Sequence, residues 1–381
     1  MASQTRAVFI HSPELERYNY PSESPFVTQR AALTRKVLAS MGLLGGSGFP
    51  AERAPEPASR AVLEKFHTAR YLDALHRASE GQLNLEGLRM GLGTGDCPVF
   101  NGLYEYAVLA CGATMTGARL ILSGETRIAF NPSGGYHHAF PERAAGFCYI
   151  TDVALACMVL AEQVKRVLYL DVDVHHADGV QSAFYSRSDV LTISFHETGT
   201  TLFPGTGFVD EIGIGEGRGY CVNAPLPPGT YDEAYLRAFR AIVPPLAKAY
   251  DPDVIVLELG MDALSGDPLA HLSLTNNAHA EVTRLVLGFN KPLLVTGGGG
   301  YHVRNTVRGW ALAWSVLCGE DSEDATNVGL GGVMLETTEW RGGLRDRVLV
   351  PDPEQRRYVE PEIDAVIEAI EKSVFPIHGL T

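Results

Sequence analysis

The stretch Val167-Leu-Tyr-Leu-Asp-Val-Asp-Val-His-His-Ala-Asp178 places three carboxylates and two imidazoles directly after an apolar run. In an extended strand, alternate side chains turn to opposite faces, so Asp171, Asp173 and His175 are expected to project to one side. A strand that simply ends in polar residues would give the same pattern. We consider this less probable than a binding site, because buried carboxylates need partners. Carboxylate and imidazole groups side by side suit a divalent metal such as zinc, which is the interpretation that we favour.

Working outward, short apolar runs alternate with longer helical patterns. Expected strands lie at 7–10, 127–130, 167–172, 190–194, 254–257 and 292–295, and expected helices at 27–41, 105–122, 152–164, 233–249, 278–288 and 304–317. Near-continuous apolar runs are typical of strands buried on both faces, so the pattern predicts a doubly wound α/β fold with a parallel sheet. The sequence shows no linker and no repeat, which predicts a single domain over 1–381. We expect 320–354 to be a polar surface segment and 361–373 a closing helix.

Composition narrows the class of protein. The 381 residues are 45% hydrophobic and 20% charged, which predicts a large core rather than disorder. The net charge of −14 and the lack of a basic stripe disfavour direct nucleic-acid binding. An acidic surface would tolerate cationic substrates, although solubility alone would also explain it. The amino terminus lacks the apolar region of a signal peptide and no apolar run reaches membrane-spanning length, so we expect a cytoplasmic protein without a membrane partner.

The six cysteines form no CxxC pair and have no regular spacing, so they do not resemble a disulfide framework. Two of them, Cys97 and Cys148, could approach each other and form a redox switch. Two inert core thiols are the alternative that a reducing cytosol favours.

Polar clusters follow four of the expected strands. They are Ser133-Gly-Gly-Tyr-His-His138, Asp171 to Asp178, Glu258-Leu-Gly-Met-Asp262 and Gly297-Gly-Gly-Gly-Tyr301. In open parallel sheets, ligands bind beyond the carboxyl ends of the strands. Four clusters at such ends therefore predict one site at a single edge of the sheet.

Asp262 is the natural third protein ligand, since a catalytic zinc site keeps an open position beside three ligands. On its own, an aspartate after a strand would be a turn former or helix cap. His137 and His138 suit proton transfer to and from a metal-activated water and the leaving amine, with Asp171 and Asp178 as carboxylates that would orient them. A surface pair of histidines is the alternative.

Tyr301 ends a run of four glycines. Its hydroxyl could donate to a developing oxyanion beside the metal, while the glycines let the backbone pack close to the site. A phosphate cradle is the other interpretation of such a run. No Lys-Ser/Thr follows it, so a nucleotide-binding loop is unsupported.

Taken together, Pro132-Ser-Gly-Gly-Tyr-His-His-Ala139, Asp171-Val-Asp-Val-His-His-Ala-Asp-Gly-Val180, Gly260-Met-Asp-Ala-Leu-Ser-Gly-Asp267 and Gly297-Gly-Gly-Gly-Tyr301 resemble the zinc-dependent histone deacetylase family. That family includes bacterial acetylpolyamine amidohydrolases and acetoin-utilisation proteins. The resemblance is collinear, covers roughly 6–320, and is compatible with a bacterial source. It implies the arginase/deacetylase α/β fold, in which helices flank a central parallel sheet of eight strands.

The resemblance also implies residue roles. Metal ligands would be Asp173, His175 and Asp262, and the catalytic groups would be His137, His138, Tyr301, Asp171 and Asp178. Substrate would contact Asp96, Gly146, Phe147, Phe203 and Leu269. Structural potassium would use Asp171, Asp173, His175, Ser194 and Phe195, with a second site near Phe184, Arg187, Val190 and Tyr220. Arg30 resembles an arginine beside an internal acetate channel.

The predicted activity is the metal-dependent removal of acetyl or other acyl groups from lysine side chains of proteins or peptides, with zinc or iron(II). A small-molecule deacylase, such as an acetylpolyamine amidohydrolase, is the alternative. Leu269 weighs against polyamines, because polyamine-specific relatives carry a glutamate there. An arginase-like two-metal enzyme and a non-catalytic acyl-lysine-binding protein are further alternatives. The sequence leaves the substrate, acyl length and oligomeric state open.

Overall fold

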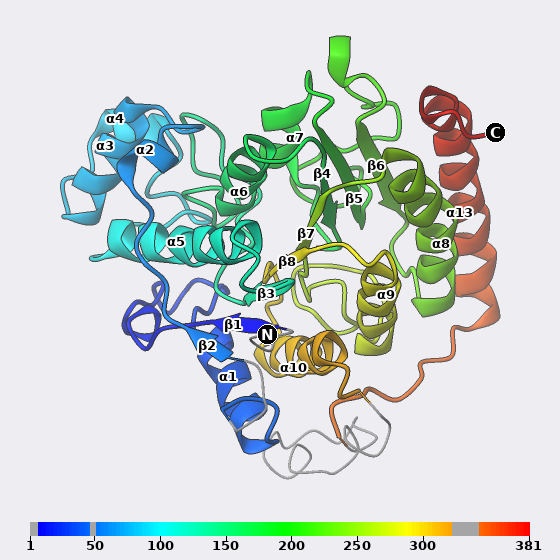
Figure 1. The fold of residues 1–381 in the computed structure, drawn as a ribbon, viewed down its shortest axis with the longest axis horizontal. Coiled ribbons are helices and arrows are strands. Elements are labelled where there is room, and N and C mark those ends of the chain that lie inside the picture. The colour runs from blue at the N-terminus through cyan, green and yellow to red at the C-terminus, as the bar shows by residue number, and fades with distance from the viewer. Residues whose placement is uncertain (1–6, 46–50, 322–342) are drawn as a thin grey trace.

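The computed structural model describes residues 7–45, 51–321 and 343–381. One parallel sheet of eight strands runs through it, in the spatial order β2-β1-β3-β8-β7-β4-β5-β6 (Figure 1). The strands are β1 (Val8–Ile10), β2 (Ala51–Arg53), β3 (Ile128–Asn131), β4 (Val167–Asp171), β5 (Val190–Glu197), β6 (Cys221–Leu226), β7 (Val254–Glu258) and β8 (Leu293–Thr296). The predicted α/β fold with a parallel sheet is confirmed.

The two strands that the apolar runs did not predict are β2 and β6, which form the two edges of the sheet. The short β2 strand reads Ala-Glu-Arg, while β6 contains Asn223 and Pro225. An edge strand has one side without a ladder partner, so it tolerates proline and polar residues that a central strand would exclude. Apolar continuity is therefore a signal only for the six inner strands.

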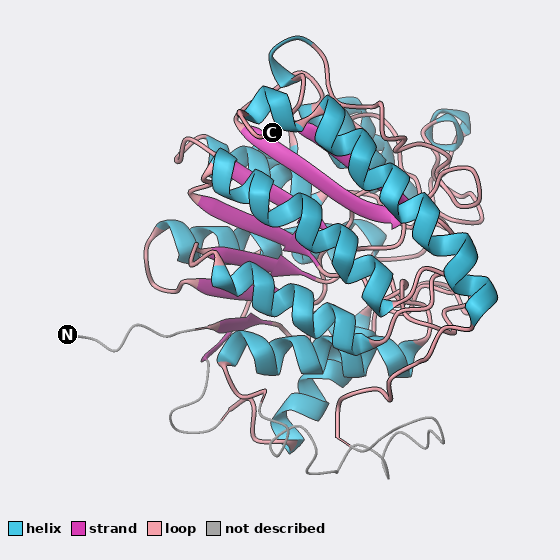
Figure 2. Cartoon of the chain, turned by 90° about the vertical axis from the view of Figure 1, so that its right-hand side faces the viewer, coloured by secondary structure: helices cyan, strands magenta, loops and turns pink. Residues whose placement is uncertain are grey.

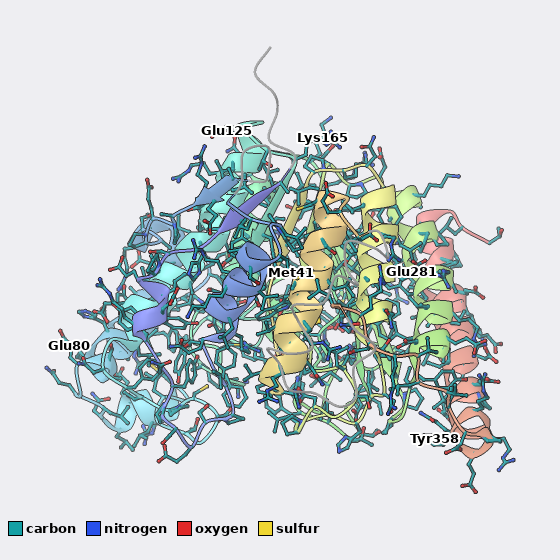
Figure 3. All side chains as sticks on the ribbon, turned by 90° about the horizontal axis from the view of Figure 1, so that it is seen from below. Met41, Glu80, Glu125, Lys165, Glu281 and Tyr358 are labelled. Carbon is teal, nitrogen blue, oxygen red and sulfur yellow. The ribbon has the colours of Figure 1, made fainter. Side chains whose placement is uncertain are left out.

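Helices cover both faces of the sheet. On one face, α1 (Arg30–Ser40), α10 (Val303–Cys318), α9 (Asn276–Gly288), α8 (Asp232–Tyr250) and α13 (Pro353–Ser373) pack side by side (Figure 2). On the other face lie α5 (Leu103–Leu122), α6 (Asp152–Ala161) and α7 (Asp178–Phe184). The short α2 (Arg60–Leu63), α3 (Ala69–Ser79) and α4 (Leu85–Arg89) gather at one end. Figure 3 shows Glu80, which follows α3, far from Tyr358 on α13.

The predicted helices over 27–41, 105–122, 152–164, 233–249, 278–288 and 304–317 correspond to α1, α5, α6, α8, α9 and α10. The closing helix starts earlier than its predicted bound of 361, because Asp352 accepts hydrogen bonds from the backbone N–H groups of Glu354 and Gln355 and Pro353 occupies the first turn. Most of the predicted surface segment 320–354 lies outside the described residues. Among those described, none of the helices is both long and apolar enough to span a membrane.

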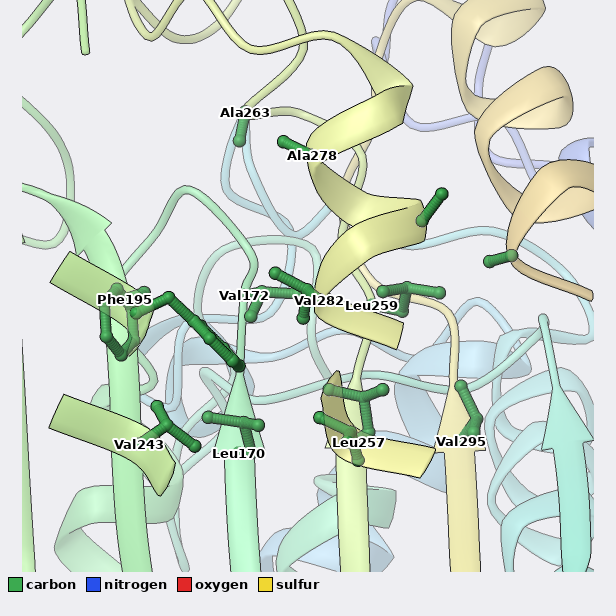
Figure 4. Packing of buried hydrophobic residues seen from close by; sticks show 14 of the residues in the cluster. Leu170, Val172, Phe195, Val243, Leu257, Leu259, Ala263, Ala278, Val282 and Val295 are labelled. Atoms are coloured by element: carbon green, nitrogen blue, oxygen red, sulfur yellow. The ribbon is translucent and has the colours of Figure 1, made fainter. Parts of the chain in front are cut away.

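One of the apolar core clusters lies between the sheet and the α8–α10 layer. Leu170, Leu257 and Val295, from the neighbouring strands β4, β7 and β8, face Val243 of α8 and Val282 of α9 (Figure 4). Each such side chain contributes about 2 kcal/mol when fully buried. This packing holds the inner strands in fixed register, so their carboxyl ends meet at one edge.

One local prediction was wrong. Strand β4 ends at Asp171, so Asp173 and His175 follow it in a loop rather than continuing the strand. The carboxylate of Asp171 accepts the backbone N–H of Asp173 at 2.9 Å, and the carboxylate of Asp173 accepts that of His175 at 2.9 Å. Aspartates that bond their own backbone two residues on favour turns over strand continuation. The three side chains are buried all the same, but turns place them there rather than strand alternation.

Candidate active site and metal centre

The four polar clusters meet as predicted. They follow β3, β8, β7 and β4, which are consecutive neighbours in the sheet. The polar side chains of His137, Asp171, Asp173 and Asp262 are almost completely buried there. Buried ionisable groups require partners, so their common position defines a site rather than a solvated rim.

One group of three side chains has the composition of a metal site. Asp173, His175 and Asp262 bring a ligand atom each to within 4.8 Å of one another. The Nδ1 atom of His175 lies 3.2 Å from a carboxylate oxygen of Asp173 and 3.1 Å from one of Asp262. Asp262 is no helix cap, since it is fully buried and its other oxygen accepts the N–H of Val174 at 2.9 Å. Two carboxylates against one imidazole fit a divalent cation of the zinc or iron(II) type.

The glycine run packs against these carboxylates. A Cβ atom on Gly299 would lie 1.9 Å from Asp262, and one on Gly260 would lie 2.1 Å from Asp173, so neither position can hold a side chain. The N–H of Gly299 donates to Asp173 at 2.6 Å. These contacts agree with the interpretation that the glycines permit close packing, and they direct this N–H to a carboxylate rather than to a phosphate.

Arg30 supports the glycine run from the other side. Its buried guanidinium donates to the carbonyls of Gly300 at 2.7 Å and Gly298 at 3.1 Å. The charge also lies over the rings of Phe26, at 4.5 Å, and Trp310, at 5.1 Å. Arg30 therefore fixes the backbone that approaches the metal ligands.

Two imidazole–carboxylate pairs lie beside the three candidate ligands. Asp171 accepts from Nδ1 of His137 at 2.9 Å, and Asp178 accepts from Nδ1 of His138 at 2.7 Å. The Nε2 atoms of the two histidines are 3.0 Å apart. Burial, and next the charge of His137, lower the pKa of His138 to about 4. His138 is therefore a neutral imidazole at neutral pH, with Nδ1–H fixed by Asp178 and with Nε2 as an acceptor that faces Nε2 of His137.

Glu258 and Tyr169 belong to this cluster, although the sequence interpretation gave them no role. The hydroxyl of Tyr169 lies 2.5 Å from Asp171 and 2.6 Å from Glu258, and Glu258 lies 3.1 Å from Nδ1 of His137. Two signals could have found them. Tyr169 precedes Asp171 by two residues, which puts both on one face of β4, and Glu258 is a carboxylate that ends an apolar strand.

Three of the predicted substrate residues, Gly146, Phe147 and Phe203, lie against His138 or Tyr301. The Phe203 ring is 46% exposed, and its centroid lies 5.0 Å from that of His138. Phe147 packs against Tyr301 with 5.6 Å between ring centroids. Gly146 has φ of 52°, and a Cβ there would lie 2.4 Å from His138. Aromatic walls on two sides suit a slender apolar stem, such as that of an acylated lysine.

The rim, formed by Asp96, Phe203 and Leu269, is more exposed to solvent than the buried site. Asp96 accepts the N–H of Gly146 at 3.0 Å, so its carboxylate also holds the wall. Asp267 links the rim to the site, since it accepts from the backbone N–H groups of Leu269 at 3.0 Å and Tyr301 at 2.7 Å. A groove of about 840 Å³ runs beside the entrance and is lined in part by Asp96, Phe203 and Asp178.

Burial, and next the charge of Asp262, raise the pKa of Tyr301, which keeps its hydroxyl protonated as a donor.

The residues assigned to potassium lie around β5. Asp171 is register partner to Ser194, next to Phe195, and the hydroxyl of Ser194 lies 2.8 Å from His196. The second set surrounds the start of the same strand, where the N–H of Arg187 donates to the carbonyl of Phe184 and Val190 begins β5. The carbonyl of Tyr220 accepts the N–H of Thr192. Both ion sites stay predictions.

Cys97 and Cys148 are free, buried thiols. Burial raises the pKa of each, so both hold their protons at neutral pH. Because the thiolate is the reactive form, their surroundings favour inert core thiols over a redox pair.

Known proteins share this architecture. The family model "Histone deacetylase domain" matches residues 24–317. The chain is 40% identical over 325 residues to histone deacetylase 3 of Oryza sativa subsp. japonica, covering 85% of this chain and 63% of that protein. It is 41% identical over 323 residues to the acetoin utilization protein AcuC of Bacillus subtilis, covering 83% of each. The chain thus spans less than two thirds of the rice relative.

A solved structure agrees with the sequence match. The HDAC homologue from Aquifex aeolicus superposes with a TM-score of 0.85 at 31% identity, covering 96% of this chain and 100% of that one. Three observations agree: the shared fold, the extent of the family match and the four clusters at one sheet edge. They confirm the resemblance seen in the sequence, and this chain belongs to the histone deacetylase family.

Proposed function

We propose that the protein is a metal-dependent amide hydrolase that removes acetyl or other acyl groups from lysine side chains of peptides or proteins. The observation that carries this proposal is the position of Asp173, His175 and Asp262 beside His138, whose ring centroid lies 5.9 Å from that of His175. A cation site and a neutral imidazole base at this spacing suit hydrolysis of an amide. Relatives named as histone deacetylases support the same interpretation.

The ligand set of two carboxylates and one imidazole fits zinc or iron(II). When bound, such an ion supplies Lewis-acid polarisation of the acyl carbonyl and lowers the pKa of a water molecule. His137 or His138 would take a proton from the attacking water through Nε2, and His138 would deliver a proton to the leaving amine nitrogen. Asp178 holds the ring in the required tautomer. Tyr301 would donate its hydroxyl hydrogen to the oxygen that gains charge.

Substrate selection would follow from the entrance. Phe147 and Phe203 would flank the acyl-lysine stem and exclude water, and Asp96 at the rim would hold the peptide backbone. Potassium at the two sets around β5 would be structural. One solved HDAC homologue is complexed with SAHA, and we expect this protein to bind the same compound.

The test is hydrolysis of a peptide panel by the zinc-loaded protein, with acetyl-, longer-acyl- and trifluoroacetyl-lysine beside acetylputrescine and acetylcadaverine. We expect turnover on acyl-lysine that a chelator abolishes and added zinc or iron(II) restores. Turnover on the acetylated polyamines alone would contradict the lysine assignment and favour a small-amine deacylase. Metal binding without hydrolysis of any substrate would contradict the enzyme assignment and favour an acyl-lysine-binding protein.

A further inference from the structure

We propose that Glu258 is a positioning residue, which holds His137 in place through a closed network of hydrogen-bonding groups. The network consists of His137, Asp171, Tyr169 and Glu258, and it is called the four-residue network below. The inference deepens the proposed function and rests on it for its catalytic consequence. Its structural part can be tested without substrate.

Three contacts at hydrogen-bond geometry and one close approach connect the four side chains in a ring. Nδ1 of His137 lies 2.9 Å from Oδ2 of Asp171, and the Tyr169 hydroxyl lies 2.5 Å from that same oxygen. The hydroxyl also lies 2.6 Å from Oε2 of Glu258, whose Oε1 returns to within 3.1 Å of Nδ1 of His137. Glu258 is completely buried, and Oε1 receives no well-directed hydrogen bond. A buried oxygen that faces an N–H at this distance is a second acceptor for that hydrogen.

The backbone makes this arrangement rigid. Asp171 and Glu258 are register partners at the ends of β4 and β7, so the sheet fixes their separation. Tyr169 lies two residues earlier on β4, in the apolar layer under α5 and α6. The other oxygen of Asp171 accepts the backbone N–H of Asp173, which holds that carboxylate in place, but a single Asp171–His137 hydrogen bond would leave the His137 ring free to tilt about it. The Tyr169–Glu258 arm removes that freedom, since it contacts both members of the pair.

The network predicts which substitution it tolerates. Tyr169 has one hydroxyl hydrogen but two carboxyl oxygens within hydrogen-bond distance, so one more donor is needed between these groups. A glutamine at 258 supplies it, because its NH₂ can donate to the Tyr169 oxygen while its carbonyl oxygen faces His137. Leucine has a similar volume but offers neither contact. Glu258→Gln should therefore preserve the network, and Glu258→Leu should break it.

The experiment compares zinc-loaded wild type, Glu258→Gln and Glu258→Leu on an acetyl-lysine peptide, with metal content and thermal unfolding measured for each. We expect Glu258→Leu to lower kcat about tenfold with KM changed by less than about twofold, and Glu258→Gln to stay within about threefold of wild type. Unchanged kcat in Glu258→Leu would overturn the proposal. Equal losses in both variants would also overturn it, because charge rather than hydrogen bonding would then position His137.

A spectroscopic reading separates this inference from the proposed function. In protein labelled with 15N-histidine, the Nδ1–H proton of His137 is assigned by its loss in His137→Ala. We expect its chemical shift to move in Glu258→Leu and to stay near the wild-type value in Glu258→Gln, whether or not any substrate is hydrolysed. A shift that is the same in all three proteins would overturn the positioning role even if the enzyme is active.

Two further variants guard against a misfolded Glu258→Leu. Tyr169→Phe removes only the bridging hydroxyl, and we expect it to move the same resonance and lower kcat with little change in KM. Unchanged kcat and resonance in that variant would count against the network. Asp232→Asn is the control for loss of a partly buried, hydrogen-bonded carboxylate, since Asp232 accepts from the N–H and hydroxyl of Thr275, away from the site, and should change neither kcat nor the resonance.

Discussion

The three candidate metal ligands and the two imidazole–carboxylate pairs lie at the same sheet edge but differ in how their charges are matched. In the first group, Asp173 and Asp262 both approach the single Nδ1 of His175. In the second, Asp178 pairs with His138, while the two carboxylates that face Nδ1 of His137, Asp171 and Glu258, also lie beside the Tyr169 hydroxyl. A surplus of carboxylate without such a side-chain hydroxyl favours a cation, whereas carboxylates that have side-chain donors favour the holding and transfer of protons. Charge balance among the same residue types thus separates two tasks a few ångströms apart.

The largest expected effect comes from removing a ligand of the first group. Asp262→Ala should abolish zinc binding and bring turnover to background, because the cation loses one of three protein ligands. In the wild type, zinc should raise the melting temperature, since a ligand that binds only the folded state stabilises it. The variant should show no such rise. Full zinc occupancy of the variant by elemental analysis would refute the ligand assignment.

His138→Ala tests the other side of the comparison. Turnover should fall about 10³-fold while zinc content stays at the wild-type level, since a general base contributes about 10²- to 10⁴-fold. Metal content and kcat measured on the same sample separate the two tasks. Parallel loss of metal and turnover would mean that the two groups cannot be divided in this way.

Tyr301→Phe removes one hydroxyl and leaves both groups intact. We expect metal to be retained and kcat to fall about 10²-fold, as for the loss of one donor to a developing oxyanion. Wild-type rates on an acetyl-lysine peptide would remove Tyr301 from the mechanism.

Asp178→Asn should have a smaller effect on turnover, about tenfold to hundredfold in kcat, because it disturbs the tautomer of His138 without removing the base. The measurement is kcat at constant zinc occupancy, with KM expected to change little. A loss as large as that of His138→Ala would show that the carboxylate takes part more directly than by orientation.

The last effect is on stability rather than on turnover, and it concerns a buried imidazole outside both groups. His67 contacts the carbonyl of Phe140 through Nδ1, accepts the N–H of Thr151 through Nε2, and burial lowers its pKa to about 4. The unfolded chain, with an ordinary pKa of about 6.5, binds the proton first, so stability is full above pH 6.5 and falls as the pH drops toward 4. The loss is on the order of 3 kcal/mol. As the pH is lowered across this range, the melting temperature of His67→Asn should fall less steeply than that of the wild type. An equal slope in the two proteins would exclude His67 as a cause of the lost stability.

The sequence predicted the inner sheet and the grouping of the candidate site residues at one sheet edge because both have local signals. Leu168 and Leu170 belong to an apolar run, and Asp173 and His175 belong to a short motif. Strand β6 lacked such a signal, since its edge position tolerates Pro225. The turn after Asp171 was missed because side-chain bonds to the backbone overrode strand alternation.

Glu258 was missed for a different reason. Its role depends on β7 lying beside β4, and Asp171 and Glu258 are too far apart in the sequence for either motif alone to show that they are register partners. Periodicity reports which face a side chain occupies, but not which strand lies next to it. Residue partners of this kind require the strand order.

The contact between Arg30 and the carbonyls of Gly298 and Gly300 spans about 270 positions of the chain. Loop closure over such a distance is slow, and residues that meet this way do so late in folding. During synthesis, Arg30 of α1 therefore cannot form these hydrogen bonds until the glycine run that follows β8 has been made. The cation site would mature as one of the last events in folding, so metal acquisition should follow chain completion rather than accompany it.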